Sequence, residues 1–358
     1  MTNISLWNNL DTQKRKYHNG GQKKNDRESE AYVMDIRFEK REHLKEKPDQ
    51  KHLGFGKYMT DYMFVMDWTK EEGWKDARIV PEGPITMDPA CVTLHYAQET
   101  FEGMKAYRTA EGKIQLFRPE MNAKRMINSN ARLCMPEFPV DMFVEAVKAL
   151  VKVEEDWVPS EPETSLYIRP FMFATEAALG VHMASAYKFM IICCPVGAYY
   201  AEGINPVKIL VEDELVRAVK GGTGFTKCGG NYAGSILGQV KAEKMGYSQV
   251  LWLDGEHRKY VEEVGTMNIM FKIAGEIYTA PIEGTVLPGV TRDSMIHLLR
   301  DWGYKVNETR LSVDDLMKAG HDGTLEEVFG TGTAAVISPV GKIVDHGKEI
   351  CFPSGMEK

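Results

Sequence analysis

The apolar residues of this chain gather in short, dense runs, and residues 63–68 and 92–103 are the first two. Their aromatic and β-branched content predicts buried strands. Residues 106–118 predict a hairpin, because Glu111 and Gly112 offer a tight turn between two apolar arms. The other predicted strands cover residues 165–174, 187–196, 207–212 and 249–253, and a second hairpin covers residues 268–282.

Other segments repeat apolar residues every three or four positions, which is the spacing of one face of a helix. Residues 141–157 show this pattern, and so do residues 232–244. In the latter, the predicted buried face comprises Ile236, Leu237 and Val240. Two more helices are predicted from their first residues, one with Thr291 as N-cap and one at the capping-box-like residues 312–315. Strands and helices mix without strict alternation, so the sequence predicts an α+β fold.

The length of 358 residues is more than one hydrophobic core usually serves, so two domains are expected. Residues 1–30 are polar and charge-rich, which predicts a mobile N-terminal arm. A small N-terminal α/β domain is predicted over residues 31–196, and a larger C-terminal domain over residues 207–358. Between them, the glycines and prolines of residues 197–206 predict a linker.

Composition then limits the functional classes. The chain is 43% hydrophobic and 27% charged, as globular proteins usually are, and its net charge is −7. That charge argues against nucleic acid and anionic membranes as partners. The longest apolar stretch, residues 189–201, is too short to cross a bilayer, and the first residues lack the apolar core of a signal peptide. The six cysteines show no CxxC and no disulfide spacing, so we expect reduced thiols and a cytoplasmic protein.

Lys227 is unusual because five glycines surround it between Gly221 and Gly230. Glycine lets the backbone approach another group closely, which an ordinary surface lysine does not require. A buried lysine that loses its proton and attacks a carbonyl does require such surroundings. Taken alone, the run favours a lysine that merely lies in a flexible loop.

Glu263 and two turns favour the reactive lysine. A pyridine nitrogen stays protonated only when a carboxylate is held against it, and the apolar residues after Glu263 predict a buried strand end. Residues 287–292 and 329–334 each place a threonine near glycine in a turn that suits an anion. One amine, one carboxylate and two anion-binding turns predict a pyridoxal 5'-phosphate site, and no metal site is predicted.

Two nucleotide-binding motifs are approached but not matched. A P-loop requires glycine before its lysine and Ser or Thr after it, whereas Thr226 and Cys228 flank Lys227. Residues 330–335 resemble a dinucleotide fingerprint, but Pro339 shortens the helix that this motif requires. Nucleotide binding is therefore not predicted.

From about Lys51 to its end, the chain resembles the branched-chain amino acid aminotransferases, which are fold-type-IV pyridoxal phosphate enzymes. The strings that carry the resemblance are HYAQETFEGMKAY, LFRPEMNAKRM, TSLYIRPF, CPVGAYY, VRAVKGGTGFTKCGGNYA, QVLWLDG, EEVGTMN, LPGVTR and EVFGTGTAAVISPVG, in family order and spacing. The resemblance implies a two-domain fold of the D-amino acid aminotransferase type, an active site between the domains and a homodimer.

Position by position, the resemblance implies that Lys227 is the catalytic lysine and binds the cofactor covalently. Glu263 would pair with the pyridine nitrogen and Tyr232 with the ring hydroxyl. The other implied cofactor-binding residues are Arg125, Arg217, Thr266, Leu287, Gly289, Val290, Thr291 and Thr333. The implied substrate-binding residues are Phe101, Tyr167, Arg169, Tyr199, Thr266, Thr333 and Ala334. Those implied to complete the neighbouring subunit's pocket are Tyr96, Leu179 and Val181.

Three features depart from the family's pattern. Eukaryotic members have a CxxC centre after the threonine turn, where this chain has Ala335 and Ser338, so a thiol switch is not expected there. Residues 1–30 have no counterpart in the family. The chain also ends at Lys358, before the helix and strand that relatives usually have at this end.

The resemblance implies reversible amino transfer between leucine, isoleucine or valine and 2-oxoglutarate. A D-amino acid aminotransferase and an aminodeoxychorismate lyase are alternatives within the same fold. FEGMKAYR and GGNYA, which are strings of the branched-chain type, disfavour the lyase. The alternative from another class is a catalytically silent, amino-acid-binding relative of the enzyme.

Overall fold

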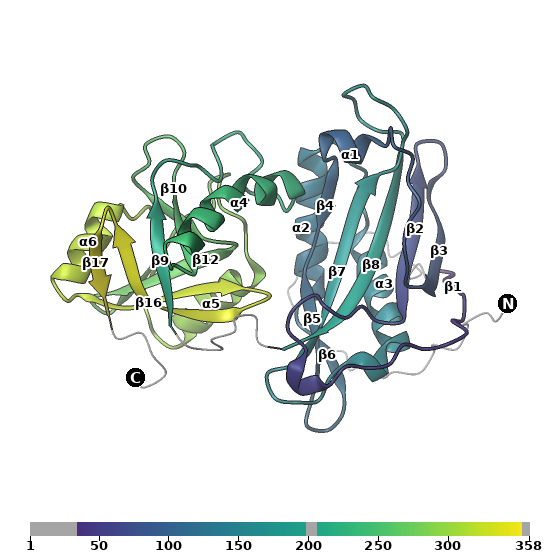
Figure 1. Ribbon diagram of the computed structural model, residues 1–358, viewed down its shortest axis with the longest axis horizontal. Helices are drawn as coiled ribbons and strands as arrows, with labels where there is room; N and C mark the ends of the chain where they lie inside the picture. Colours follow the sequence, from purple (N-terminus) through teal and green to yellow (C-terminus); the bar gives the residue numbers. More distant parts are fainter. Residues whose placement is uncertain (1–33, 198–205, 353–358) are drawn as a thin grey trace, which may run out of the picture.

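The computed structural model describes residues 34–197 and 206–352, so the predicted N-terminal arm and most of the predicted linker lie outside the described residues. Two β-sheets organise the described residues and lie side by side in Figure 1. The first sheet uses strands before residue 197 and the second uses strands after residue 206, and we call these halves the N-terminal and C-terminal lobes. In the described part of the chain, no helix is both long and apolar enough to cross a membrane.

The sheet of the N-terminal lobe has eight strands in the order β1-β3-β2-β8-β7-β5-β6, with β4 paired to β7. These strands are β1 (Arg37–Phe38), β2 (Tyr62–Thr69), β3 (Gly73–Pro81), β4 (Glu99–Phe101), β5 (Met104–Arg108), β6 (Ile114–Leu116), β7 (Ser165–Ala174) and β8 (Ala186–Val196). The helices are α1 (Val92–Tyr96), α2 (Pro119–Arg132) and α3 (Val140–Val153), with short 3-10 helices η1 (Gln50–His52) and η2 (Glu155–Trp157). Met126 of α2 and Phe143 of α3 share one core with Phe64 and Phe189 of the sheet.

The C-terminal lobe has a nine-stranded sheet in the order β11-β10-β9-β16-β15-β12-β13-β14, with β17 paired to β16. Because β11 also pairs with β12, six of these strands close into a ring. The strands are β9 (Val207–Glu212), β10 (Gln249–Leu253), β11 (Val261–Val264), β12 (Met267–Ile273), β13 (Glu276–Thr279), β14 (Val306–Glu308), β15 (Leu325–Gly332), β16 (Val336–Asp345) and β17 (Lys348–Cys351). The helices are α4 (Gly229–Lys244), α5 (Val290–Asp301) and α6 (Val313–His321). A core that includes Leu251, Phe271 and Leu316 joins the ring to α6.

Several predicted elements are confirmed, and with them the α+β fold class. The second hairpin turns at Ala274 and Gly275, both with positive φ (48° and 80°), as a tight hairpin turn requires. Ser312 caps α6, because its side chain accepts a hydrogen bond from the Asp315 amide. The run after Gly330 continues into strand β16 rather than into a helix, which agrees with the rejection of the dinucleotide fingerprint.

Two predictions about helix starts and strands were wrong. Residues 92–103 are not one strand: residues 92–96 form helix α1, which the left-handed Ala97 (φ 50°) ends, and only Glu99–Phe101 pairs as a strand. The apolar density was misleading because Leu94 is 59% exposed. Thr291 is not the N-cap of α5, since the Asp293 amide already donates to the Gly289 carbonyl and the helix begins at Val290.

The predicted buried face of α4 was also wrong. Ile236 and Leu237 are 60% and 56% exposed. The helix instead rests on the ring of Trp252 through Gly238, where an added Cβ would lie 2.7 Å from the indole. The side of α4 that packs on the sheet is therefore set by Gly238, which has no side chain. Apolar periodicity cannot reveal such a contact.

The two sheets are separate and each has its own core, but the division into two domains stays a prediction. The boundaries at residues 196 and 207 stay a prediction, because most of the intervening segment lies outside the described residues.

Candidate active site

A cavity of about 370 Å³ lies between the lobes, which is the size of a small-molecule site. The N-terminal lobe contributes Phe55, Phe101, Gly103, Arg125, Tyr167 and Arg169. The C-terminal lobe contributes Lys227, Tyr232, Glu263, Thr266, Met267, Asn268, Leu287, Gly289, Val290, Thr291, Thr331, Gly332, Thr333, Ala334 and Ala335. The structure therefore brings most of the predicted site residues to one cavity.

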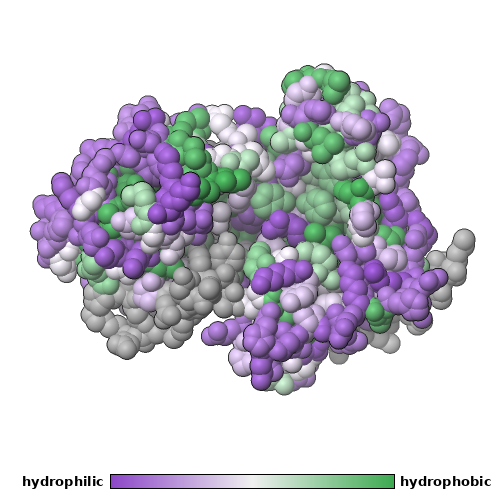
Figure 2. Space-filling model, in the orientation of Figure 1, coloured by the Kyte–Doolittle hydropathy of each residue, from purple (hydrophilic) through white to green (hydrophobic). Residues whose placement is uncertain are grey.

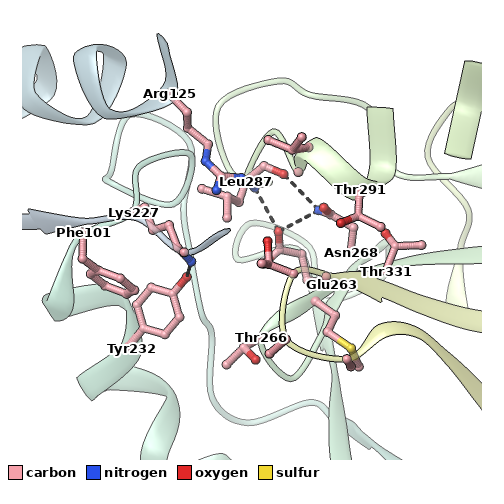
Figure 3. Close-up of a pocket in the computed structure, with 18 of the residues that line it drawn as sticks. Phe101, Arg125, Lys227, Tyr232, Glu263, Thr266, Asn268, Leu287, Thr291 and Thr331 are labelled. Carbon is pink, nitrogen blue, oxygen red and sulfur yellow. Dashed lines mark hydrogen bonds between the residues drawn. The ribbon is translucent and has the colours of Figure 1, made fainter. Parts of the chain in front are cut away.

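The amine of Lys227 lies in the cavity wall beside two aromatic rings (Figure 3). Its Nζ donates to the hydroxyl of Tyr232 at 2.7 Å and is 4.7 Å from the centre of the Phe101 ring. Burial lowers the pKa of this amine to about 8, and the positive charge of Arg125 acts in the same direction. A substantial fraction of the amine is therefore neutral at mildly alkaline pH, as a nucleophile or base requires.

Glu263 lies in the same cavity, on strand β11, and is only 4% exposed. Its Oε1 accepts hydrogen bonds from the Leu287 amide (2.9 Å) and from Asn268 Nδ2 (3.1 Å), as Figure 3 shows. Its Oε2 is 2.9 Å from Arg217 Nε, an ion pair by distance that lacks the angle of a hydrogen bond. Burial raises the pKa of Glu263, while Arg217 and the Leu287 amide oppose that rise and favour the carboxylate.

Arg217 does not line the main cavity but supports it from behind. Besides Glu263, its guanidinium donates to the carbonyls of Gly224 (3.1 Å) and Thr285. A direct contact between Arg217 and a cofactor stays a prediction, and the contact with the cavity that the structure shows runs through the carboxylate of Glu263.

Arg125 lies on α2 and is almost fully held by Glu102, a residue that sequence reasoning missed. Its Nε and Nη2 donate to the two carboxylate oxygens of Glu102 at 2.8 and 2.7 Å, and Nη1 donates to the Pro288 carbonyl at 3.1 Å. The expected two-pronged contact with a phosphate does not fit this arrangement, because Glu102 occupies the fork. The Nη1 side, which reaches the turn before α5, is the part that faces the anion-binding region.

The start of α5 supplies that region with Gly289, Val290 and Thr291. The first amides of a helix have no acceptor inside the helix and lie at its positive end, so they bind anions well. Gly289 is required here, because an added Cβ would lie 2.0 Å from Asn268 Oδ1. On strand β15, Thr331 Oγ1 is buried and has no hydrogen-bond partner among the described residues, so it is free to bind a ligand.

Another part of the cavity wall combines a cation with aromatic rings. Arg169 Nη2 donates to the Tyr167 hydroxyl at 2.8 Å, and its guanidinium lies 4.8 Å from the centre of the Phe101 ring. Arg169 Nε is buried without a partner within the described part of the chain. Tyr167 packs so closely on Gly103 that a Cβ there would lie 2.2 Å from the hydroxyl.

The loop after β15 is fixed by a lysine of the other lobe. Lys105 of β5 is 7% exposed, and its Nζ donates to the Ala334 carbonyl at 2.8 Å. Burial lowers the pKa of this amine to about 8. Lys105 was missed because its partner is more than two hundred residues away in sequence.

The residues predicted to serve a neighbouring subunit lie away from the cavity. The Tyr96 hydroxyl donates to the Leu179 carbonyl, and Leu179 and Val181 are 64% and 82% exposed. Tyr199 lies outside the described residues. Asn268 and Thr331 line the cavity and were missed, although they are cross-strand partners and Asn268 ends the string EEVGTMN. Within the described residues, no group of His, Cys, Asp and Glu is arranged to hold a metal ion.

Comparisons with known proteins identify the family of this chain. A family model described as "Amino-transferase class IV" matches residues 99–343. Branched-chain-amino-acid aminotransferase 2 of Bacillus subtilis is 52% identical over 320 residues, which is 89% of this chain and 88% of the relative. Branched-chain-amino-acid transaminase 1 of the same organism is 53% identical over 89% of this chain and 90% of its own length.

The chain is also similar to solved structures of branched-chain amino acid aminotransferases. The branched-chain amino acid aminotransferase of Escherichia coli has a TM-score of 0.67 at 27% identity and covers 82% of this chain and 90% of its own. The enzyme of Thermobaculum terrenum, solved in its PLP-form, has a TM-score of 0.65 at 25% identity and covers 79% of this chain and 85% of its own. The chain belongs to the class IV aminotransferase family, as its sequence predicted.

Proposed function

We propose that this chain is a pyridoxal 5'-phosphate-dependent branched-chain amino acid aminotransferase, which transfers an amino group reversibly between leucine, isoleucine or valine and 2-oxoglutarate. The observation that carries the proposal is one cavity that holds an amine of lowered pKa, a buried carboxylate paired with arginine and the start of a helix. The relatives named above as branched-chain enzymes support the choice of substrates.

The residues present fit the cofactor. Lys227 would bind it covalently, Glu263 would hold a proton on the ring nitrogen and Tyr232 would contact the ring hydroxyl. The unpartnered Thr331 hydroxyl and the first amides of α5 offer donors for a phosphate. The remaining proposed contacts are those of Arg125, Thr266, Leu287, Gly289, Val290, Thr291 and Thr333, with Arg217 acting through Glu263.

When bound, pyridoxal phosphate supplies an electron sink for the electrons left on a substrate carbon that loses its proton. The protein's part is to move that proton and to keep water out. With a pKa of about 8, the Lys227 amine can accept a proton at Nζ and return it within the cavity. Arg217 and two N–H donors hold the Glu263 carboxylate and oppose the rise in its pKa that burial causes.

Both kinds of substrate side chain find suitable surroundings in the cavity. Phe55, Phe101 and Met267 offer apolar walls for a branched side chain. Arg169 and Tyr167, with an Nε that has no partner among the described residues, offer donors for the second carboxylate of 2-oxoglutarate. Thr266 and the turn at Thr333 and Ala334 are the proposed site of the carboxylate next to the reacting carbon.

We further propose that the active form is a homodimer. Exposed apolar residues gather on the loop between β7 and β8 and on α1, at the top of Figure 2. They are Leu94, Tyr96, Leu179, Val181 and Met183. Covering them with a second copy would remove apolar surface from water and bring Tyr96, Leu179 and Val181 to the neighbour's cavity.

The six cysteines are free in the structure, which supports the proposal of a reducing, cytoplasmic setting.

An assay of glutamate formation from leucine and 2-oxoglutarate tests the proposed activity, with D-alanine in place of leucine as the control for the D-amino acid alternative. The proposal predicts turnover with leucine, isoleucine and valine and a yellow protein whose absorption changes when leucine is added. A colourless protein without turnover would instead support a silent relative.

A further inference from the structure

The backbone of Lys227 is bound by the lobe to which Lys227 does not belong. Its carbonyl accepts a hydrogen bond from the Phe101 amide at 2.9 Å, and its amide donates to Ser129 Oγ at 3.0 Å. Two residues later, the Gly229 amide donates to the carboxylate of Glu99. The peptide of the reactive lysine is therefore anchored on both sides by the N-terminal lobe.

Ser129 is well placed to fix this peptide. It is 1% exposed and lies on α2, four residues after Arg125, so both side chains project from one face of the helix. Arg125 borders the cavity, and its positive charge adds to burial in lowering the pKa of the Lys227 amine. One rigid helix thus holds the lysine backbone and the guanidinium at a set separation.

Glu99 holds the other end of the segment. Gly229 is the first residue of α4, and the N-cap residue Cys228 makes no side-chain capping bond in the described structure. The Glu99 carboxylate takes over this role from β4, where a negative charge also favours the positive end of the helix. An added Cβ at Gly229 would lie 2.1 Å from Glu99 Oε1, so this close approach requires glycine.

We propose that Ser129 and Glu99 are positioning residues, which hold Lys227 from the opposite lobe so that its amine enters the cavity only when the two lobes are packed together. Neither residue lines the cavity. The proposal rests on the proposed function for its kinetic consequences, but the anchoring itself does not depend on the reaction.

Hydrogen exchange of the full chain tests the anchoring without any activity. In Ser129→Ala, and separately in Glu99→Ala, we expect exchange in the peptide that covers residues 225–231 to rise about tenfold, because a part-buried amide loses its acceptor. Glu99→Gln keeps an acceptor oxygen and should exchange nearly as slowly as the wild type. Ser312→Ala, which removes a buried N-cap serine of α6 far from the cavity, is the control for general loss of stability.

Kinetics of the cofactor-loaded enzyme then separate positioning from folding. For Ser129→Ala and Glu99→Ala we expect kcat with leucine to fall about three- to tenfold while KM changes less than about twofold, since only the alignment of the amine is lost. The pH at which kcat is half-maximal should also move upward as water reaches the amine. The charged and titratable groups that face it are Arg125, Glu102, Tyr167, Arg169, Tyr232 and Glu263.

Folded variants that keep wild-type exchange at residues 225–231 would overturn the proposal. So would an equal rise in exchange across remote peptides, or an equal loss of kcat in Ser312→Ala. If the wild type shows no aminotransferase activity but the local exchange rises as expected, the anchoring stands and the proposed function fails.

Discussion

Glu263→Gln should disable the enzyme, whereas Glu262→Gln should be mild. The two residues are neighbours on β11, but successive side chains of a strand point to opposite faces. Glu263 lines the main cavity, while Glu262 lines a separate small pocket and accepts a hydrogen bond from Thr285 Oγ1 at 2.5 Å. Glu262→Gln is therefore a matched control of equal chemistry and similar burial.

The magnitude follows from the ion pair with Arg217. At the 2.9 Å that separates the two groups, unit charges attract by about 6 kcal/mol at an effective dielectric constant of about 20. Both side chains are buried, so removing one charge leaves the other uncompensated, which typically costs roughly 3–5 kcal/mol. If about 3–4 kcal/mol of this stabilisation acts on the transition state, kcat falls on the order of 10²- to 10³-fold.

The assay is steady-state turnover of leucine and 2-oxoglutarate with saturating cofactor, with circular dichroism to show that each variant is folded. A folded Glu263→Gln variant with kcat within about threefold of the wild type would refute the role of this carboxylate. A crippled Glu262→Gln variant beside an active Glu263→Gln variant would show that the assignment is off by one position.

Three further predictions follow from single contacts. Lys227→Ala should abolish multiple turnover while thermal denaturation shows a folded protein, because the base and the covalent attachment are lost together; near-wild-type turnover would contradict this. In urea denaturation, Gly238→Ala should lower the free energy of unfolding by about 1–3 kcal/mol, since its Cβ would lie 2.7 Å from Trp252. The control Gly234→Ala, whose Cβ has no neighbour within 4 Å in the described structure, should be neutral or stabilising. Lys105 has a folded-state pKa of about 8, below its unfolded value, so the cost of burying its charge is present below pH 8 and is lost as pH rises toward about 10. Relative to the Lys105→Met variant, the stability of the wild type should therefore rise by on the order of 2 kcal/mol over that pH range. Parallel pH profiles of the two proteins in urea denaturation would contradict the assigned pKa.

The sequence located the cavity residues that carry a local signal, but it missed contacts between distant elements. The spacing of glycines and carboxylates indicated Lys227, Glu263 and the turn before α5. The turn residues indicated the hairpin at Gly275. The resemblance to a family then placed most of the cavity wall. Each of these signals is contained in a few consecutive residues, which is why it could be found in one sequence.

Sequence analysis missed the contacts in which a residue's partner comes from another element. Glu102 binds the guanidinium of Arg125, 23 residues away in sequence, and Lys105 donates to the Ala334 carbonyl of the other lobe. Neither pairing leaves a periodic trace in the sequence, because each depends on how separate elements dock. The buried side of α4 was misjudged for a similar reason, since Gly238 packs on Trp252 while the apolar residues beside it stay exposed.

The half-reaction with leucine alone tests the central claim most directly. Cofactor-loaded protein is mixed with leucine in the absence of any 2-oxo acid, and the absorption spectrum and the released 4-methyl-2-oxopentanoate are measured, with Lys227→Ala as the control. Amino transfer through Lys227 predicts one 2-oxo acid released per cofactor-loaded chain, a loss of the yellow absorption that 2-oxoglutarate restores, and no release by Lys227→Ala. Release of no 2-oxo acid by the wild type, or equal release by Lys227→Ala, would contradict the account.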